Sequence, residues 1–141
     1  MKKQDFNGAK LVLVIGDQLV TILRDDRPDI VWPNMWDFPG GGREGMESPA
    51  DCVLRETHEE LGLALPPSAL VWAQDFPNLD NRAQRSWWFG AVLPKGHEDQ
   101  IQFGDEGQRW RLMSPERWLN DPRAIPTFKP RLRLALVGLG L

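Results

Sequence analysis

The amino-acid sequence predicts an α/β (α+β) sandwich that forms one domain over residues 1–141. Short segments rich in Val, Leu and Ile predict buried strands, and other segments carry the signals of helices. The length suits a single domain, and hydrophobic residues make up 41% of the chain, which is enough for one core. We therefore expect helices packed against a sheet.

Six segments have the composition of strands. Apolar residues dominate most of them, and a Gly-Asp turn at residues 16–17 separates the first two. Residues 25–34 contain two prolines and several charges, and they predict a loop. Residues 39–42 are expected to be irregular, because three consecutive glycines favour neither helix nor strand. The predicted strands are residues 9–15, 18–24, 35–38, 70–74, 86–93 and 108–113.

The principal helix is expected at residues 49–61, between two capping signals. Ser48 is a good N-cap, Pro49 suits the first helical position, and Asp51 follows Ser48 at the spacing of a capping box. Gly62 is expected to end the helix. Two further helical segments are predicted, a short turn at residues 115–119 and a C-terminal helix at residues 130–137.

Composition and charge argue against several classes of protein. The formal net charge is -3, the sequence pI is about 5.4, and Lys and Arg form no long block, so we expect no binding to duplex nucleic acid. The apolar segments are too short for a signal-peptide core or for a membrane span of about 20 residues. The single cysteine, Cys52, forms no intrachain disulfide and is expected to pack as a small residue. We expect a cytoplasmic monomer or homodimer.

The two faces of the predicted helix differ in chemistry. At 100° per residue its apolar residues form one stripe, made of Ala50, Val53, Leu54, Thr57 and Leu61. Glu56, Glu59 and Glu60 lie together on a flank of that stripe, at i, i+3 and i+4 spacing. Clustered carboxylates repel one another, and a bound divalent cation removes the repulsion. The helix alone leaves two interpretations open, a metal site and a solvated acidic face.

A glycine-rich segment precedes this acidic helix. Gly40, Gly41 and Gly42 allow the backbone to approach a ligand closely and expose its amide and carbonyl groups. The segment leads through residues 43–47 to the N-terminus of the helix. Taken by itself, such a loop is equally often a plain turn.

The spacing of fixed residues over residues 41–63 resembles the Nudix box. The matching residues, in order, are Gly41, Glu47, Arg55, Glu56, Glu59, Glu60, Gly62 and Leu63. Thr57 departs from the family, which usually has an aliphatic residue there, and Gly45-Met46 precedes Glu47 where glycine usually stands directly before the glutamate. The resemblance identifies the chain as a member of the Nudix family, similar to its MutT-type members. It implies an α/β/α sandwich with a mixed sheet and a loop-helix-loop catalytic motif.

The Nudix resemblance also implies an activity and a metal. Members of the family are pyrophosphohydrolases that use Mg²⁺, with Mn²⁺ as a possible substitute, to cleave a nucleoside diphosphate linked to another group. The implied metal ligands are the carboxylates of Glu56, Glu59 and Glu60 and the backbone carbonyl of Gly41. Arg55 and Glu47 match a pair that orients the loop against the helix, and an ordinary surface salt bridge is the alternative.

A second, shorter resemblance lies late in the chain. Residues 104–108 resemble a loop of MutT-type members that supplies another acidic group. Glu106 is therefore implied as a further metal ligand or as the general base, and a plain turn is the alternative. Glu59, Glu60 and Glu106 all stay open as the base, and together with Arg55 they form the predicted catalytic set.

Four residues are predicted to bind the substrate, a small-molecule nucleotide. Arg24 aligns with a phosphate-contacting arginine of MutT-like members, Gly40 and Gly42 offer backbone groups, and Phe128 stands about where MutT has a purine-reading asparagine. A pairing of Arg24 with a neighbouring aspartate and a core position for Phe128 are the alternatives. Base stacking and core packing are likewise the two interpretations of Trp32, Trp36 and Trp88, and core packing is preferred for each.

The best-matching substrate is a nucleoside triphosphate, cleaved to a monophosphate and pyrophosphate. The chain has no tyrosine, so it lacks the tyrosine that is associated with diadenosine polyphosphate members. The alternative function is a non-hydrolysing Nudix module that senses a nucleotide. Degenerate box carboxylates would favour that alternative, and here all of them are present.

Overall fold

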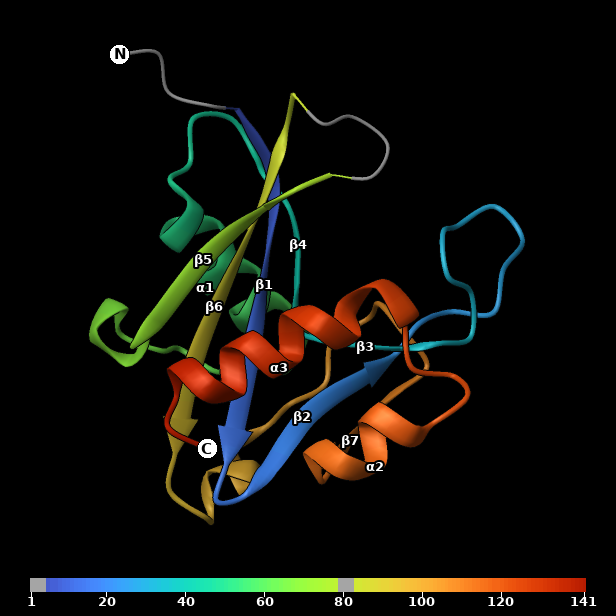
Figure 1. Ribbon diagram of the computed structural model, residues 1–141, viewed down its shortest axis with the longest axis vertical. Helices are drawn as coiled ribbons and strands as arrows, with labels where there is room; N and C mark the ends of the chain where they lie inside the picture. Colours follow the sequence, from blue (N-terminus) through green and yellow to red (C-terminus); the bar gives the residue numbers. More distant parts are fainter. Residues whose placement is uncertain (1–4, 79–82) are drawn as a thin grey trace.

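A computed structural model describes residues 5–78 and 83–141 (Figure 1). The described residues form seven strands, three α-helices and three short 3₁₀ helices. The strands are β1 (Phe6–Ile15), β2 (Gln18–Leu23), β3 (Trp36–Asp37), β4 (Gly40–Gly42), β5 (Trp72–Pro77), β6 (Arg85–Leu93) and β7 (Arg109–Met113). The helices are α1 (Pro49–Leu61), α2 (Pro115–Asn120), α3 (Lys129–Gly138), η1 (Pro67–Ala69), η2 (His97–Gln100) and η3 (Pro126–Phe128).

The strands join in one mixed sheet. Its main path runs β3-β2-β1-β6-β5, with β4 paired to β1 and β7 paired to β2. Strands β1 and β6 are parallel, and the other pairs are antiparallel. The long connection that a parallel pair requires contains α1, which is thereby placed against the sheet. The mixed sheet expected from the Nudix resemblance is confirmed.

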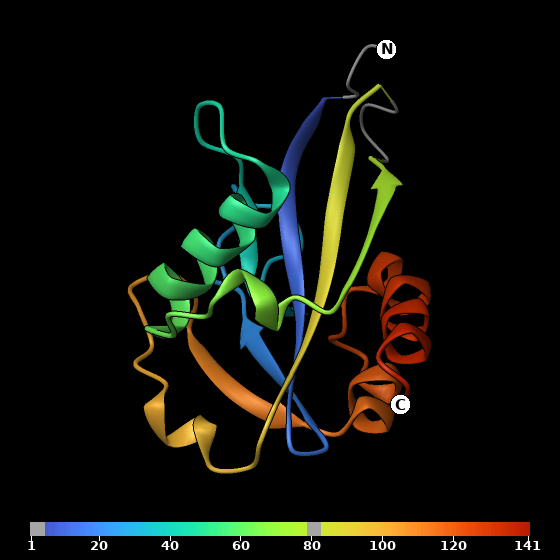
Figure 2. The same ribbon diagram turned by 90° about the vertical axis from the view of Figure 1, so that its left-hand side faces the viewer.

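Helices cover both faces of this sheet, α1 on one side and α2 and α3 on the other (Figure 2). Side chains alternate along a strand, so Leu11 and Leu13 of β1 pack with α1, while Val12 and Val14 join the core beneath α2 and α3. Each face therefore has its own apolar core, and the predicted α/β/α sandwich is confirmed.

Helix α1 begins and ends at the predicted residues. The Ser48 hydroxyl accepts a hydrogen bond from the Asp51 backbone N–H at 3.1 Å, and Gly62 ends the helix in the left-handed conformation at φ 69°. Cys52 is fully buried, as expected of a packed residue. Thr57 is also fully buried. Its hydroxyl donates to the Val53 carbonyl at 2.7 Å, so burial leaves no unpaired polar group there.

The glycine segment differs from its prediction. Gly40–Gly42 was expected to be irregular and instead forms β4, whose residues pair with Gly8, Ala9 and Lys10 of β1. Backbone hydrogen bonds need no side chain, and β1 supplies the partner: Ala9 and Lys10 lie in the predicted strand, and Gly8 belongs to the part of β1 that begins earlier than predicted. Pairing with a distant strand thus outweighs the weak intrinsic strand preference of glycine.

Smaller differences concern the ends of elements. The strand predicted at 70–74 is displaced to β5, and the strand predicted at 35–38 shortens to the two residues of β3. The helical turn predicted at 115–119 is a complete capped helix, α2. Among the described residues, no helix is both long and apolar enough to cross a membrane.

Candidate active site

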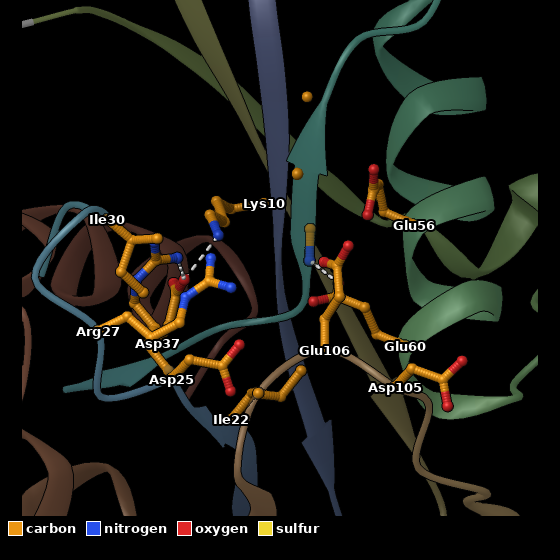
Figure 3. Close-up of a pocket in the computed structure, with 15 residues that line it drawn as sticks. Lys10, Ile22, Asp25, Arg27, Ile30, Asp37, Glu56, Glu60, Asp105 and Glu106 are labelled. Atoms are coloured by element: carbon orange, nitrogen blue, oxygen red, sulfur yellow. Dashed lines mark hydrogen bonds and ion pairs between the residues drawn. The ribbon is translucent and has the colours of Figure 1, made fainter. Parts of the chain in front are cut away.

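A cleft of about 560 Å³ opens between α1, β4 and two loops, one after β2 and one before β7. Charged side chains and glycines make up most of its wall. Figure 3 shows Glu56 and Glu60 on one side of the cleft and Lys10 and Asp37 on the other. The lining residues are Lys10, Ile22, Arg24, Asp25, Arg27, Ile30, Asp37, Gly40, Gly41, Gly42, Glu56, Glu60, Asp105, Glu106 and Gly107.

Two glycines bring β4 close to its neighbours. Gly40 has φ 135°, and a Cβ there would overlap the carbonyl of Ala9 in β1. A Cβ at Gly41 would lie 2.7 Å from the carboxyl carbon of Glu56. Gly40 therefore allows β4 to lie close to β1, and Gly41 keeps space open beside the Glu56 carboxylate.

Glu56 and Glu60 of α1 form the acidic wall of the cleft, and Glu60 is the more enclosed of the two. Its Oε1 accepts a hydrogen bond from the Gly40 backbone N–H at 2.7 Å, which ties α1 to β4. Burial raises the pKa of Glu60 to about 7, and the negative charges of Asp37 and Glu56 act in the same direction. The positive charge of Lys10 and the Gly40 hydrogen bond oppose this rise.

Arg55 connects the glycine segment to the carboxylates of α1. Its guanidinium donates to both carboxylate oxygens of Glu47, at 2.7 and 2.9 Å, and to the Gly42 carbonyl at 2.8 Å. It also donates to Glu56 at 3.0 Å and to Glu59 at 3.2 Å. The hydrogen bonds from Arg55 lower the pKa of Glu47. The structure therefore brings Arg55 and Glu47 together between the glycine segment and α1, and their orienting role stays a prediction.

Glu56 and Glu59 differ in their exposure. Desolvation by burial raises the pKa of Glu56, although Arg55 acts against it, whereas the Glu59 side chain is 54% exposed. Arg55 and the Gly40 N–H hold Glu56, Glu59 and Glu60 in separate hydrogen bonds. With the side chains in these positions, the described residues 5–78 and 83–141 contain no group of three acidic, cysteine or histidine side chains close enough together to hold a metal ion.

The late acidic loop nevertheless meets α1. A smaller pocket of about 160 Å³ adjoins the cleft, and all of its lining residues are acidic: Glu56, Glu59, Glu60, Asp105 and Glu106. The structure therefore brings the predicted Glu106 to the predicted glutamates of the helix. Asp105 was not singled out from the sequence, and its position beside Glu106 in the same acidic loop was the signal that could have identified it.

The chemistry of this wall suits a hard divalent cation. Carboxylate and carbonyl oxygens are the ligands that Mg²⁺ and Mn²⁺ prefer, and the acidic pocket offers them from both α1 and the loop before β7. Gly41 leaves room for an ion beside Glu56, because any Cβ there would fill that space. The residues present therefore fit a divalent metal, and its ligands stay predictions.

Arg24 lies on the opposite wall of the cleft. Its Nε donates to the Val31 carbonyl at 2.9 Å, and its Nη1 approaches Asp37 Oδ2 at 3.2 Å. The expected alternative partner was Asp25 or Asp26, so the actual pairing with Asp37 is a longer-range contact.

Lys10 and Asp37 were not identified from the sequence. Lys10 donates to the same Asp37 oxygen at 2.8 Å. The signal was present, because Lys10 is a charged residue on the face of β1 that continues as buried Val12 and Val14. Asp37 similarly stands between the buried Trp36 and Phe38.

Phe128 is not brought to the cleft. It packs on the opposite sheet face, edge-on to Trp88 with ring centroids 4.8 Å apart. Trp36 and Trp88 are also buried in that core, as preferred from the sequence. Phe128 aligns with the purine-reading asparagine of MutT, but its ring lies away from the carboxylates of the cleft.

Comparisons with known proteins identify the family of this chain. The model of the NUDIX domain matches residues 7–133. The RNA pyrophosphohydrolase of Acidiphilium cryptum is 34% identical over 119 residues, which cover 74% of this chain and 71% of that protein. The RNA pyrophosphohydrolase of Aeromonas hydrophila is 32% identical over 98 residues, covering 56% of this chain and 55% of that protein.

A solved structure shows the same fold. The MutT protein from Methanosarcina mazei aligns with a TM-score of 0.72 and 17% identity, covering 95% of both chains. The matched family model spans the glycine segment, α1 and the late acidic loop. We conclude that this chain belongs to the NUDIX domain family and is a Nudix hydrolase.

Proposed function

We propose that this protein uses Mg²⁺, or Mn²⁺ in its place, to hydrolyse a nucleoside 5′-triphosphate to a nucleoside monophosphate and pyrophosphate. One observation supports this more than any other: a single cleft has an acidic wall on α1 and a wall with Lys10 and Arg24 opposite it. A polyphosphate needs both, metal-neutralised carboxylates on one side and cations on the other.

The predicted site residues then have two kinds of task, metal binding and positioning. Glu56, Glu59, Glu60, Glu106 and the Gly41 carbonyl would hold the metal, whose bound form supplies charge neutralisation and activation of water. Arg55 keeps Glu47 and the glycine segment fixed against α1. Phosphoryl transfer depends mainly on such positioning and on charge stabilisation.

The proposed reaction is a direct attack of water and needs no covalent intermediate. A water oxygen attacks one of the two phosphorus atoms joined by the α,β-bridging oxygen, and the bond from that phosphorus to the bridging oxygen breaks. The other phosphate group leaves with the bridging oxygen, so that the products are the monophosphate and pyrophosphate. The proton of the water passes to a carboxylate, for which Glu59, Glu60 and Glu106 are the candidates. Cys52 takes no part, because it is fully buried and burial raises the pKa of its thiol to about 11.

A second candidate substrate is the 5′-triphosphate end of an RNA. Two relatives are named RNA pyrophosphohydrolases, a name that indicates hydrolysis of a pyrophosphate bond on RNA. The cleft also favours it, since Ile22 and Ile30 are the large apolar side chains among its described lining residues and no aromatic ring encloses a base there. A site that contacts the phosphates more than the base would accept both a nucleoside triphosphate and the 5′-triphosphate end of an RNA.

One panel of substrates tests the proposed function. Nucleoside triphosphates, a 5′-triphosphorylated oligonucleotide, nucleotide sugars and a diadenosine polyphosphate are incubated with the protein and Mg²⁺, and then with EDTA. Pyrophosphate is detected with and without added pyrophosphatase. Metal-dependent release of pyrophosphate from triphosphates supports the proposal, and a higher kcat/KM for the oligonucleotide selects the second candidate. Turnover of nucleotide sugars alone would contradict both, and binding without turnover would indicate the sensing module.

A further inference from the structure

Lys10 and Arg24 form the cationic wall of the cleft, and both contact one buried carboxylate, that of Asp37. Asp37 has a side chain that is only 6% exposed, and its Oδ1 accepts the Phe38 backbone N–H at 2.7 Å. Its Oδ2 receives both Lys10, at 2.8 Å, and Arg24, at 3.2 Å. Two cations therefore share one anion, which leaves an excess positive charge facing the cleft.

The position of Lys10 is unusual for a residue that only balances charge. It lies on the central strand β1, on the face of Val12 and Val14, where an apolar residue would be ordinary. Asp37 already has Arg24 and a backbone N–H as partners, so pairing alone does not require a second cation. Holding a lysine in this partly buried position costs desolvation that a purely structural role leaves unexplained.

Lys10 also lies beside the glycine segment. Its Cα pairs with that of Gly40, whose N–H binds Glu60, so its side chain starts from the point where the two walls meet. Lys10 Nζ donates to Asp37, and the Phe38 carbonyl lies 3.5 Å away. Within the described part of the chain, these acceptors occupy two of the three N–H donors of an ammonium group and leave one for a ligand.

We propose that Lys10 is a substrate-positioning residue, whose ammonium, held in place by Asp37, donates a hydrogen bond to a phosphate oxygen of the bound triphosphate. This inference rests on the proposed function and extends it by one residue. With Arg24 on the other side of Asp37, it gives the phosphate chain two fixed cationic contacts opposite the acidic wall. Asp37 sets their orientation and does not itself contact the substrate.

Three variants test this role by kinetics. Lys10→Met removes the charge at nearly constant length, Lys10→Arg keeps it, and Lys95→Met is the control at an exposed turn. Loss of one charge-assisted hydrogen bond should raise KM for the triphosphate at least about tenfold, with kcat changed much less. Lys10→Arg should recover part of the loss, and Lys95→Met should match the wild type. An unchanged KM in Lys10→Met with a lower melting temperature would make Lys10 a mere partner of Asp37 and would overturn the inference.

A binding measurement keeps the test independent of turnover and of variant stability. The wild-type protein, with ¹³C at the lysine Cε, is titrated with an α,β-methylene nucleoside triphosphate and Mg²⁺, because that analogue resists cleavage at the proposed bond. The Lys10 signal, assigned with Lys10→Arg, should move during the titration, and the Lys95 signal should not. A stationary Lys10 signal at saturation contradicts the inference. If Lys10 responds while no triphosphate is hydrolysed, the inference stands and the proposed function fails.

Discussion

Arg55 holds the carboxylate of Glu47 with two parallel hydrogen bonds, from Nε to Oε2 at 2.7 Å and from Nη2 to Oε1 at 2.9 Å. The same Nη2 donates to the Gly42 carbonyl at 2.8 Å. One side chain of α1 thus ties down both the end of β4 and the loop that follows it. A lysine cannot reproduce this planar arrangement, because it lacks the paired donors.

The first prediction follows from that geometry. Arg55→Lys should lower kcat by about 10- to 100-fold, in the range of changes to groups that orient metal ligands. The overall fold should survive, because the apolar stripe of α1 is untouched. Activity is measured together with the melting temperature, and Arg117→Lys on the exposed face of α2 serves as the control. Wild-type turnover in Arg55→Lys would reduce the Arg55–Glu47 pair to an ordinary salt bridge.

The second prediction concerns the glutamates of α1. Glu59→Gln and Glu60→Gln should each lose at least about 100-fold in kcat, as expected when a metal ligand or a general base is removed. Folding should persist, since neither change introduces a charge or a larger side chain. Glu116→Gln, on the exposed surface of α2, is the matched control. If both variants turn over substrate like the wild type, these glutamates are not part of the active site.

The third prediction concerns Arg24. Arg24→Ala should raise KM for the true substrate about tenfold or more, through loss of a charge-assisted contact to phosphate. Arg24→Lys should recover only part of this loss, because it restores the charge but not the paired donors. Because Arg24 also pairs with Asp37, the melting temperature of each variant is recorded alongside. An unchanged kcat/KM in Arg24→Ala would remove the residue from the phosphate site.

The fourth prediction uses the raised pKa of Glu60. A carboxyl whose folded-state pKa is about 7, against an ordinary pKa of 4.5, binds its proton more tightly in the folded protein. Its contribution to stability is therefore present at low pH and is lost as pH rises from about 4.5 to about 7. In EDTA, the free energy of unfolding of the wild type should decline over this window relative to that of Glu60→Gln.

Addition of Mg²⁺ gives the complementary result. Metal binding requires the ionised carboxylate, so saturating Mg²⁺ should stabilise the wild type most at high pH. Urea unfolding at several pH values, with and without Mg²⁺, measures both effects. Parallel pH profiles of wild type and Glu60→Gln in EDTA would show that the Glu60 carboxyl is not enclosed as the structure has it.

The fifth prediction separates the two roles considered for Phe128. Because its ring packs edge-on against Trp88, Phe128→Ala should destabilise the fold by about 2–3 kcal/mol, somewhat less than for a fully buried phenylalanine. KM should stay close to that of the wild type. A large rise in KM without loss of stability would instead support the base contact expected from the resemblance to MutT.

Features that depend on neighbours along the chain could be predicted from the amino-acid sequence. The apolar runs of β1, β2 and β6 and the caps at Ser48 and Gly62 were identified correctly, because strand composition and capping are local signals. The spacing of Glu56, Glu59 and Glu60 placed them on one flank of α1 for the same reason. Helical geometry converts such spacing directly into proximity.

Contacts between distant segments could not be predicted in this way, because they form only when the whole chain folds. Lys10 meets Asp37 across 27 positions, and Gly40 meets Glu60 across 20, and no local pattern encodes either pairing. The strand formed by Gly40–Gly42 exists because β1 offers it a partner, and Phe128 lies opposite the cleft because the sheet separates α3 from α1. Strand register and the choice of sheet face are properties of the assembled core, and they decide which polar groups finally share one cleft.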